Sequence, residues 1–337
     1  MKAPFPYFGK KDRVADVVWE RFGNVPNYVE PFFGSGAVLL ARPHEPGLET
    51  VNDIDVFLAN FWRAVKADPA KVAEYADWPV NEADTSARHL WLVKYREEMR
   101  ERISLDPDAF DAKVAGWWVW GLSLWLASAW CSGDGPWTDD GNGHWVKVPA
   151  SMKRLGIVRG LPHMTPRGVN RRTSPNDKKM DREALIEWMA ELQSRLRRVR
   201  VCSGDWSRVV TKAVTTGLGL TGVFLDPPYD LNGRAKVYAH DTAVAASVRT
   251  WAIKHGDNPD MRIALCGYEG VKMPSTWETY AWAAGGYGAQ GMSSGRRNGA
   301  RERIWFSPHC LKDGEHTPHA SVRKGPPKWL QSGRRRR

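Results

Sequence analysis

The sequence predicts an α/β fold built on a mainly parallel sheet. Short apolar segments typical of buried strands alternate with segments of helical periodicity. A glycine-rich turn, Gly34-Ser35-Gly36, joins one strand to a helix, and two other strands end on an acid, Asp53 and Asp226. Because ligands of open α/β sheets bind at the carboxyl ends of the strands, these features predict a site at that end of the sheet.

The elements of the first hundred residues follow from the spacing of their apolar side chains. We expect a helix over 14–22, strands at 28–29 and 51–53, and helices over 56–66 and 82–102. The glycine turn lies between the first strand and a short helix. A strand, a turn, a helix and a second strand in this order are typical of a βαβ unit.

Residues 114–133 contain no charged side chain and approach the ~20 residues that span a membrane. Gly116 and Gly121 interrupt this segment, which also contains serine and cysteine. Polar sequence flanks it on both sides. We therefore expect a buried helix, and no membrane span.

The second half of the chain repeats the alternation after a long polar stretch. Residues 131–180 are rich in Gly, Asp, Asn, Arg and Lys without sustained periodicity, which predicts a loop. Asp181 is the expected N-cap of a helix that extends to about Arg198. The elements expected after it are strands at 200–202, 223–225, 261–267, 277–283 and 302–307, and a helix over 242–254.

Positive charge is concentrated in two segments. Of the 337 residues 42% are hydrophobic, enough for a core, and the formal net charge is +11. Residues 151–180 and 322–337 each carry +7, so the rest sums to −3. This distribution indicates an enzyme body that binds a polyanion. The four cysteines form no CxxC pair, so we expect neither a zinc site nor a disulfide.

The segment Val223 to Tyr229 is the most specific signal in the chain. Its apolar strand must end at Pro227 and Pro228, because proline cannot donate to a sheet ladder. Asp226 and the turn carbonyls can accept hydrogen bonds from an exocyclic amine, and the ring of Tyr229 can stack on a flat heterocycle. This pattern favours a site for an amino-bearing base over a plain Pro-Pro turn. As a strand-end acid, Asp226 is expected to contribute little to packing.

The glycine turn and Asp53 together indicate a nucleoside site. Glycines at a helix N-terminus let a ligand approach the backbone closely, although Gly-x-Gly alone is commonly just a turn. An acid at the end of the next strand is where a βαβ nucleoside site holds the ribose hydroxyls. The glycine turn and the acid together are therefore stronger evidence for a nucleoside site than either feature alone.

With these positions in order, the chain resembles the Dam-like, alpha-class family of DNA adenine-N6 methyltransferases, many of them encoded by phages. Members open with an aromatic-x-Gly-Gly-Lys motif. A Glu-Pro-Phe-x-Gly-x-Gly motif, an Asp after the next strand, a target-recognition insertion and Asp-Pro-Pro-Tyr then follow. All occur here in that order over roughly residues 4–307, with Lys10 in place of the second glycine.

The resemblance implies a Rossmann-like, S-adenosylmethionine-dependent methyltransferase fold with an inserted target-recognition region, acting on double-stranded DNA. It implies the cofactor S-adenosylmethionine, no metal, no membrane, no obligate protein partner and a bacterial cytoplasmic location. The implied parts are a cofactor-binding part over 1–110, a target-recognition insertion over 111–180, a catalytic part over 181–310 and a basic, disordered tail over 311–337. Residues 131–180 do not align with the recognition hairpin of GATC-methylating members, so no target sequence follows.

The family motifs also assign roles to single positions. The catalytic residues implied are Asp226, Pro227, Pro228 and Tyr229. The cofactor-binding residues implied are Tyr7, Lys11, Glu30, Phe32, Gly34, Gly36, Asp53, Asp205, Trp206 and Asp226.

Three alternatives remain open on the sequence. Cytosine-N4 transfer uses a related motif, but one that often begins with Ser. RNA adenine or protein glutamine is the substrate of related enzymes, although glutamine enzymes usually carry Asn at the position of Asp226. A non-enzymatic DNA-binding protein on the same scaffold predicts lost motif residues, and little is lost here.

Overall fold

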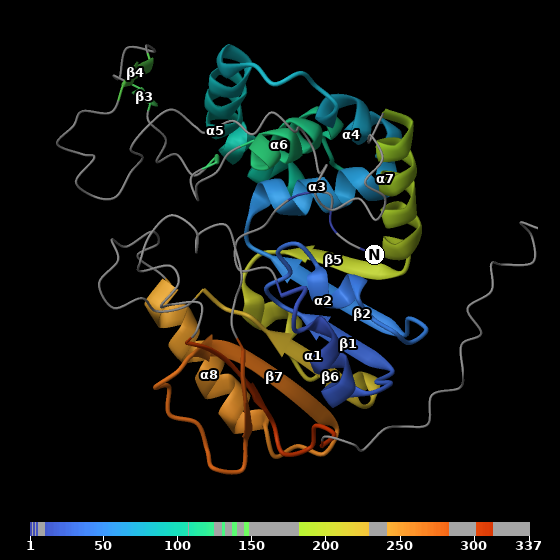
Figure 1. Cartoon of the computed structure of the whole chain (residues 1–337), viewed down its shortest axis with the longest axis vertical. Helices are drawn as coiled ribbons and strands as arrows, with labels where there is room; N and C mark the ends of the chain where they lie inside the picture. The colour runs from blue at the N-terminus through green and yellow to red at the C-terminus, as the bar shows by residue number, and fades with distance from the viewer. Residues whose placement is uncertain are drawn as a thin grey trace, which may run out of the picture.

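One mixed sheet is the frame of the molecule (Figure 1). The computed structural model describes residues 1, 3, 5, 11–106, 108–124, 130–131, 137–139, 145–147, 182–228, 241–282 and 301–312. Within them, seven strands pair in the order β5-β2-β1-β6-β7-β9-β8. Their bounds are β1 Asn27–Glu30, β2 Leu48–Asp53, β5 Val199–Ser203, β6 Thr221–Leu225, β7 Met261–Tyr268, β8 Glu278–Ala281 and β9 Glu302–Phe306.

The strand order reverses between β1 and β6. The chain passes from β1 outward through β2 to β5, then returns to β6 beside β1 and continues outward to β7. These five strands are parallel, and β9 is antiparallel to both β7 and β8. The carboxyl ends of β1 and β6 are therefore neighbours at a switch point, the place where open α/β sheets bind ligands.

Helices cover both faces of the sheet. Their bounds are α1 Ala15–Phe22, α2 Ala37–Leu40, α3 Val56–Ala67, α4 Pro69–Ala76, α5 Glu82–Leu105, α6 Ala112–Leu124, α7 Arg182–Leu196 and α8 Asp241–His255. Helices α3 to α7 gather at the β5 side of the sheet, and α8 lies beside β7 (Figure 1). Helix α3 joins this group to the sheet through its contacts with β2 and β5.

Alternate residues of the central strands belong to two separate cores. Phe224, Cys266 and Ile304 pack with the buried side chains of α1 and the helical group. Val223, Leu265 and Trp305 pack instead with α8. Because side chains alternate across a strand, the position of a residue along β6, β7 or β9 fixes the face to which it points.

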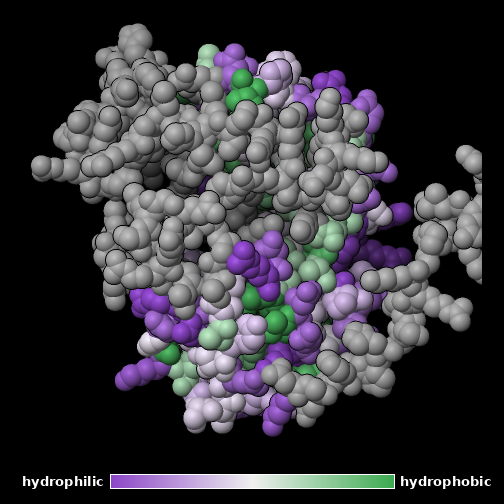
Figure 2. Space-filling model, in the orientation of Figure 1, coloured by the Kyte–Doolittle hydropathy of each residue, from purple (hydrophilic) through white to green (hydrophobic). Residues whose placement is uncertain are grey.

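The predicted α/β class is confirmed. The predicted strands and helices are present within one to three residues where the structure describes them, except that the helix expected over 114–133 does not include residues 130–131, which form a turn. The apolar segment starts as α6, in which Trp118, Val119 and Trp120 are buried. Among the described residues, no helix is both long enough and apolar enough to cross a membrane. The exposed surface mixes hydrophilic and apolar residues (Figure 2), the latter including Ile54, Trp78 and Leu105.

Two predictions of the elements were wrong, and one could not be followed. Helix α4 was missed, although Asp68 caps it through the backbone N–H of Lys71 and Pro69 occupies its first turn. The stretch expected as a loop contains two short strands, β3 Trp137–Asp139 and β4 Trp145–Lys147, which pair antiparallel. Tryptophan, threonine and valine in these strands favour extended backbone. The expected N-cap Asp181 lies outside the described residues.

Candidate active site

The carboxyl ends of β1, β2 and β5 are tied together by hydrogen bonds. The side-chain amide of Asn52 donates to the carbonyls of Pro31 and Gly204, at 3.1 and 2.9 Å. The backbone N–H of Phe33 donates to the carbonyl of Asn52, and that of Gly204 to the carbonyl of Asp53. The residues after these three strands are therefore held in fixed relative positions.

Asp53 fastens the glycine turn to the end of β2. Its Oδ2 accepts from the backbone N–H of Gly34, and its Oδ1 accepts from that of Asp55, both at 2.9 Å. Gly34 and Gly36 have φ angles of 48° and 64°, which side chains with a Cβ rarely adopt. Burial raises the pKa of Asp53 to about 6, against the opposing effect of these hydrogen bonds. Each carboxylate oxygen can still accept a second hydrogen bond.

Two aromatic rings lie just beyond the carboxyl ends of β1 and β5. Trp206 stacks on Phe32 with ring centroids 6.2 Å apart and an interplanar angle of 27°. Asp205 accepts from the backbone N–H of Ser207 at 2.9 Å, which caps the 3₁₀ turn Trp206–Val209 and fixes the start of the indole-bearing segment. Both rings remain partly exposed. They form an apolar surface of the kind on which a flat ring can stack.

Asp226 forms an ion pair with a buried lysine. The Nζ of Lys11 lies 2.8 Å from Oδ2 of Asp226, and the side chains are 4% and 18% exposed. The same Nζ lies 3.8 Å from Oε2 of Glu302 on β9. Burial alone would lower the pKa of Lys11, but the carboxylates of Asp226 and Glu302 outweigh it and the pKa is raised. The ion pair is a tertiary contact of Asp226 that the sequence did not predict.

Glu30 is buried at the end of β1, the strand that pairs with β6 before Asp226. It accepts a hydrogen bond from the hydroxyl of Tyr28 at 2.9 Å. Burial raises the pKa of Glu30 well above its ordinary value, the Tyr28 hydrogen bond opposes the rise, and the charge of Asp226 adds to it. Glu30 and Asp226 are thus two acids close enough for the charge of one to affect the other, and the ammonium of Lys11 pairs with Asp226.

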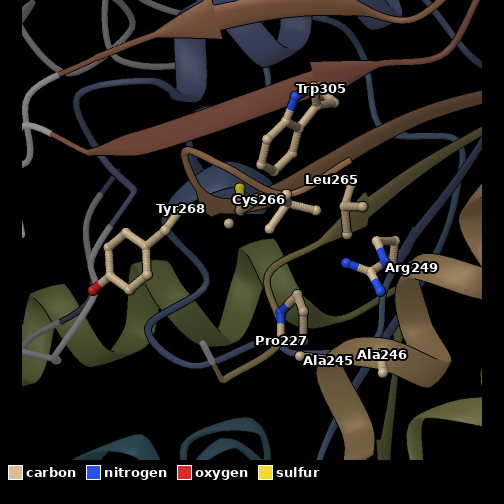
Figure 3. A pocket seen from close by; sticks show the side chains of 10 residues that line it. Pro227, Ala245, Ala246, Arg249, Leu265, Cys266, Tyr268 and Trp305 are labelled. Atoms are coloured by element: carbon tan, nitrogen blue, oxygen red, sulfur yellow. The ribbon is translucent and has the colours of Figure 1, made fainter. Parts of the chain in front are cut away.

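A small cavity lies against Pro227. Its volume is about 130 Å³. Leu265 from β7, Trp305 from β9 and Arg249 from α8 line it, and Tyr268 stands at one end (Figure 3). Leu265 and Trp305 belong to the core under α8, whereas Lys11 and Glu302 lie on the other side of the strand ends. Asp226 therefore contacts Lys11 on one side of the strand ends, and the next residue, Pro227, lines the cavity on the α8 side.

The structure brings most of the sequence-predicted residues to one end of the sheet. Three neighbouring strands end on or just before the acids Glu30, Asp53 and Asp226. The glycine turn after β1 is hydrogen-bonded to Asp53, and Lys11 pairs with Asp226. Tyr7 and Tyr229 lie outside the described residues. Among those described, no group of three or more His, Cys, Asp or Glu could hold a metal ion. Glu302 was missed by the sequence reasoning.

One comparison with known proteins bears on this site. Residues 7–98 match the family model described as D12 class N6 adenine-specific DNA methyltransferase. No curated protein shows significant similarity to the chain. The match agrees with the Dam-like resemblance and supports an enzyme that methylates adenine in DNA. It includes Lys11 and Asp53, whereas Asp226 and Glu302 lie beyond its end.

Proposed function

We propose that this protein transfers a methyl group from S-adenosylmethionine to N6 of adenine in double-stranded DNA, at specific sites, after the base is flipped out of the helix. The observation that carries the proposal is Asp226, a carboxylate at the switch point of the sheet, oriented by a buried ammonium at 2.8 Å. The match of residues 7–98 to adenine-specific enzymes supports the choice of base.

The chemistry of the donor set fits S-adenosylmethionine. Asp53 retains acceptor capacity for ribose hydroxyls, and the stacked rings of Phe32 and Trp206 offer a face to adenine. The turn at Gly34 and Gly36 brings backbone close to the same place. These residues, with Lys11 near the reacting atoms, form the proposed cofactor site. When bound, S-adenosylmethionine supplies an electrophilic methyl group on its sulfonium.

Asp226 is proposed to align the amine. The lone pair of an aromatic amine is delocalised into the ring, so the amine is a weak nucleophile. Hydrogen bonds from its N–H groups to Asp226 and to the carbonyl of Pro227 hold the nitrogen nearer tetrahedral geometry and aim it at the methyl group. In this arrangement the bound cofactor would supply the methyl group and take back the electron pair of the S–C bond, positive charge would pass from sulfur to nitrogen, and the proton that the amine loses would pass to water. Tyr229 is proposed to stack on the flipped base.

Cytosine N4 is the second candidate acceptor, because its exocyclic amine presents the same hydrogen-bonding groups. The experiment is incubation of the purified protein with labelled S-adenosylmethionine and DNA of mixed sequence, followed by mapping of the modified base. We expect N6-methyladenine at a defined set of sites. If the mapping finds N4-methylcytosine and no N6-methyladenine, the methyl acceptor is cytosine and the choice of adenine is wrong.

The role of Asp226 is tested with Asp226→Asn, which keeps the shape of the side chain. We expect transfer to fall by at least about 100-fold, as when one group that aligns the reacting atoms is displaced. Asp260→Asn is the matched control, because Asp260 is exposed and precedes β7 at the opposite end of the sheet. Transfer within about twofold of the wild type in a folded Asp226→Asn protein would contradict the mechanism.

A further inference from the structure

We propose that Glu302 is a positioning residue of the transfer reaction: from β9 it holds the ammonium of Lys11 against Asp226 and gives the three-residue cluster a net negative charge. We call Lys11, Asp226 and Glu302 the acid–lysine cluster. The inference rests on the proposed function, because it assigns a role in the same reaction to a residue more than 70 positions beyond Asp226.

The cluster is assembled from three separate parts of the chain. Lys11 precedes α1, Asp226 follows β6, and Glu302 begins β9, where it pairs with Tyr268 of β7. Glu302 lies on the same face of β9 as Ile304, which packs in the core of α1. The fold therefore turns the carboxylate of Glu302 toward the side of the sheet on which Lys11 lies.

The ammonium of Lys11 contacts two carboxylates and lies near an aromatic ring. Its Nζ is 2.8 Å from Asp226 and 3.8 Å from Glu302, and it lies 5.8 Å from the ring centroid of Trp282. The backbone N–H of Trp282 donates to the carbonyl of Glu302 at 3.4 Å, so the ring and the carboxylate are carried by neighbouring strands. An ammonium with one anionic partner can move with that partner. An ammonium between two anions is restricted in position.

Burying the carboxylate of Glu302 costs free energy unless a nearby positive charge compensates it. Its side chain is 10% exposed, and its Oε2 is buried and makes no hydrogen bond with the described residues. Such a group costs free energy, and the nearby ammonium offsets part of that cost. Burial raises the pKa of Glu302, Lys11 opposes the rise, and Asp226 adds to it. Among the described residues, Cys266 on β7 is a further titratable group close to Lys11.

The net charge of the cluster matters to the chemistry. Two carboxylates and one ammonium sum to −1, and this charge lies where the accepting amine meets Asp226. Positive charge appears on the amine nitrogen only as the new N–C bond forms. This charge comes from the sulfonium, so a negative group nearer to the amine nitrogen than to the sulfur stabilises the transition state more than the ground state, and it raises kcat more than it changes binding.

The test compares Glu302→Gln with the wild type in steady-state transfer and in calorimetric binding of S-adenosylmethionine. Glutamine keeps the size of the side chain and removes the charge. We expect kcat to fall about tenfold, because couplings within one charged network correspond to changes of roughly 2- to 150-fold. The KM for DNA and the dissociation constant of S-adenosylmethionine should stay within about twofold.

The pH profile separates a charge effect from a packing effect. In the wild type, kcat should decline on the acid side as Glu302 takes up a proton at its raised pKa. In Glu302→Gln the decline caused by protonation of Glu302 should be absent. Its kcat at neutral pH should already equal the low value that the wild type reaches when Glu302 is protonated. Glu302→Asp should recover part of kcat, because it restores the charge.

A matched control and a readout without catalysis complete the test. Glu269→Gln removes a half-exposed acid from the same β7–β9 end, where it pairs with Arg301 and Arg303, and should leave kcat unchanged. The pKa of Lys11, followed by NMR of its side-chain carbon, should fall in Glu302→Gln even in a protein that methylates nothing. Failure of transfer in the wild type would therefore refute only the proposed function. An unchanged Lys11 pKa, or a kcat equal to that of the wild type, would overturn the role of Glu302.

Discussion

The ion pair between Lys11 and Asp226 is expected to carry stability as well as function, and a double-mutant cycle can measure it. Lys11→Met leaves two carboxylates without their ammonium, so we expect a loss of about 3–5 kcal/mol, the usual cost of breaking a buried pair. Asp226→Asn leaves Lys11 with Glu302 at 3.8 Å, so the loss should be smaller, about 1–3 kcal/mol. In the double variant one acid is left over, and it can bind a proton instead.

The loss in the double variant should therefore be smaller than the sum of the two single losses, by about 1–2 kcal/mol. Urea unfolding of the four proteins at pH 7 measures all the terms, provided that the dependence of the free energy on urea is the same in each. Strictly additive losses would refute the reasoning, because they would mean that the two charges do not interact.

The pH dependence of stability shows whether Lys11 is held as a cation in this ion pair. The pKa of Lys11 is raised above its ordinary value of 10.5 in the folded protein. The stability that this ammonium contributes is therefore fully present below pH 10.5 and is lost as the pH rises through the folded-state pKa. The difference between the wild type and Lys11→Met should stay constant from pH 7 to about pH 10. A difference that disappears by pH 9 would mean that the lysine is not held as a cation.

Two further predictions concern the cofactor. Asp53→Ala should weaken S-adenosylmethionine binding by about 1–3 kcal/mol in calorimetry, the cost of losing a charged acceptor for the ribose hydroxyls. Because the pKa of Asp53 is raised from 3.8 to about 6, binding to the wild type should also weaken as the pH falls below about 6, and an equal affinity at pH 5 and pH 7 would argue against its role. Trp206→Ala should weaken binding by about 1–3 kcal/mol and Trp206→Phe by much less, since a stack needs a ring. Equal losses in these two variants would point to the indole N–H instead of the ring face.

The sheet and much of the site could be predicted because their signals are local. The apolar residues before Asp226, the prolines after it and the glycine turn each determine backbone conformation within a few residues. Helix α4 had a local signal as well, since Asp68-Pro69 is a typical helix start that the sequence reasoning passed over. The strands β3 and β4 are three residues each, too short for a two-residue period to stand out.

Glu302 could not be found in that way. It lies 291 positions from Lys11 in the sequence, and no motif contains it. Its only local signal is its spacing from Ile304 and Phe306, which places an acid on a buried face of a strand. The partner that makes such an acid tolerable is known only when β9 is inserted beside β7 in the sheet. Sequence reasoning likewise assigned Lys11 to the cofactor, and the contact with Asp226 is a tertiary one.

The acid–lysine cluster also joins the part of the chain that matches known adenine methyltransferases to the part that does not. Residues 7–98 contain Lys11 and β1, whereas Asp226 and Glu302 lie beyond the match. The 2.8 Å contact of Lys11 with Asp226, and the parallel register of Val29 with Val223, bring both parts to the same strand ends. In the proposed function, the matched segment supplies cofactor-binding residues and the rest of the chain supplies the acid that aligns the amine. Because the same lysine belongs to the matched segment and orients the acid of the unmatched one, the two halves make a single site, and the proposed chemistry needs both.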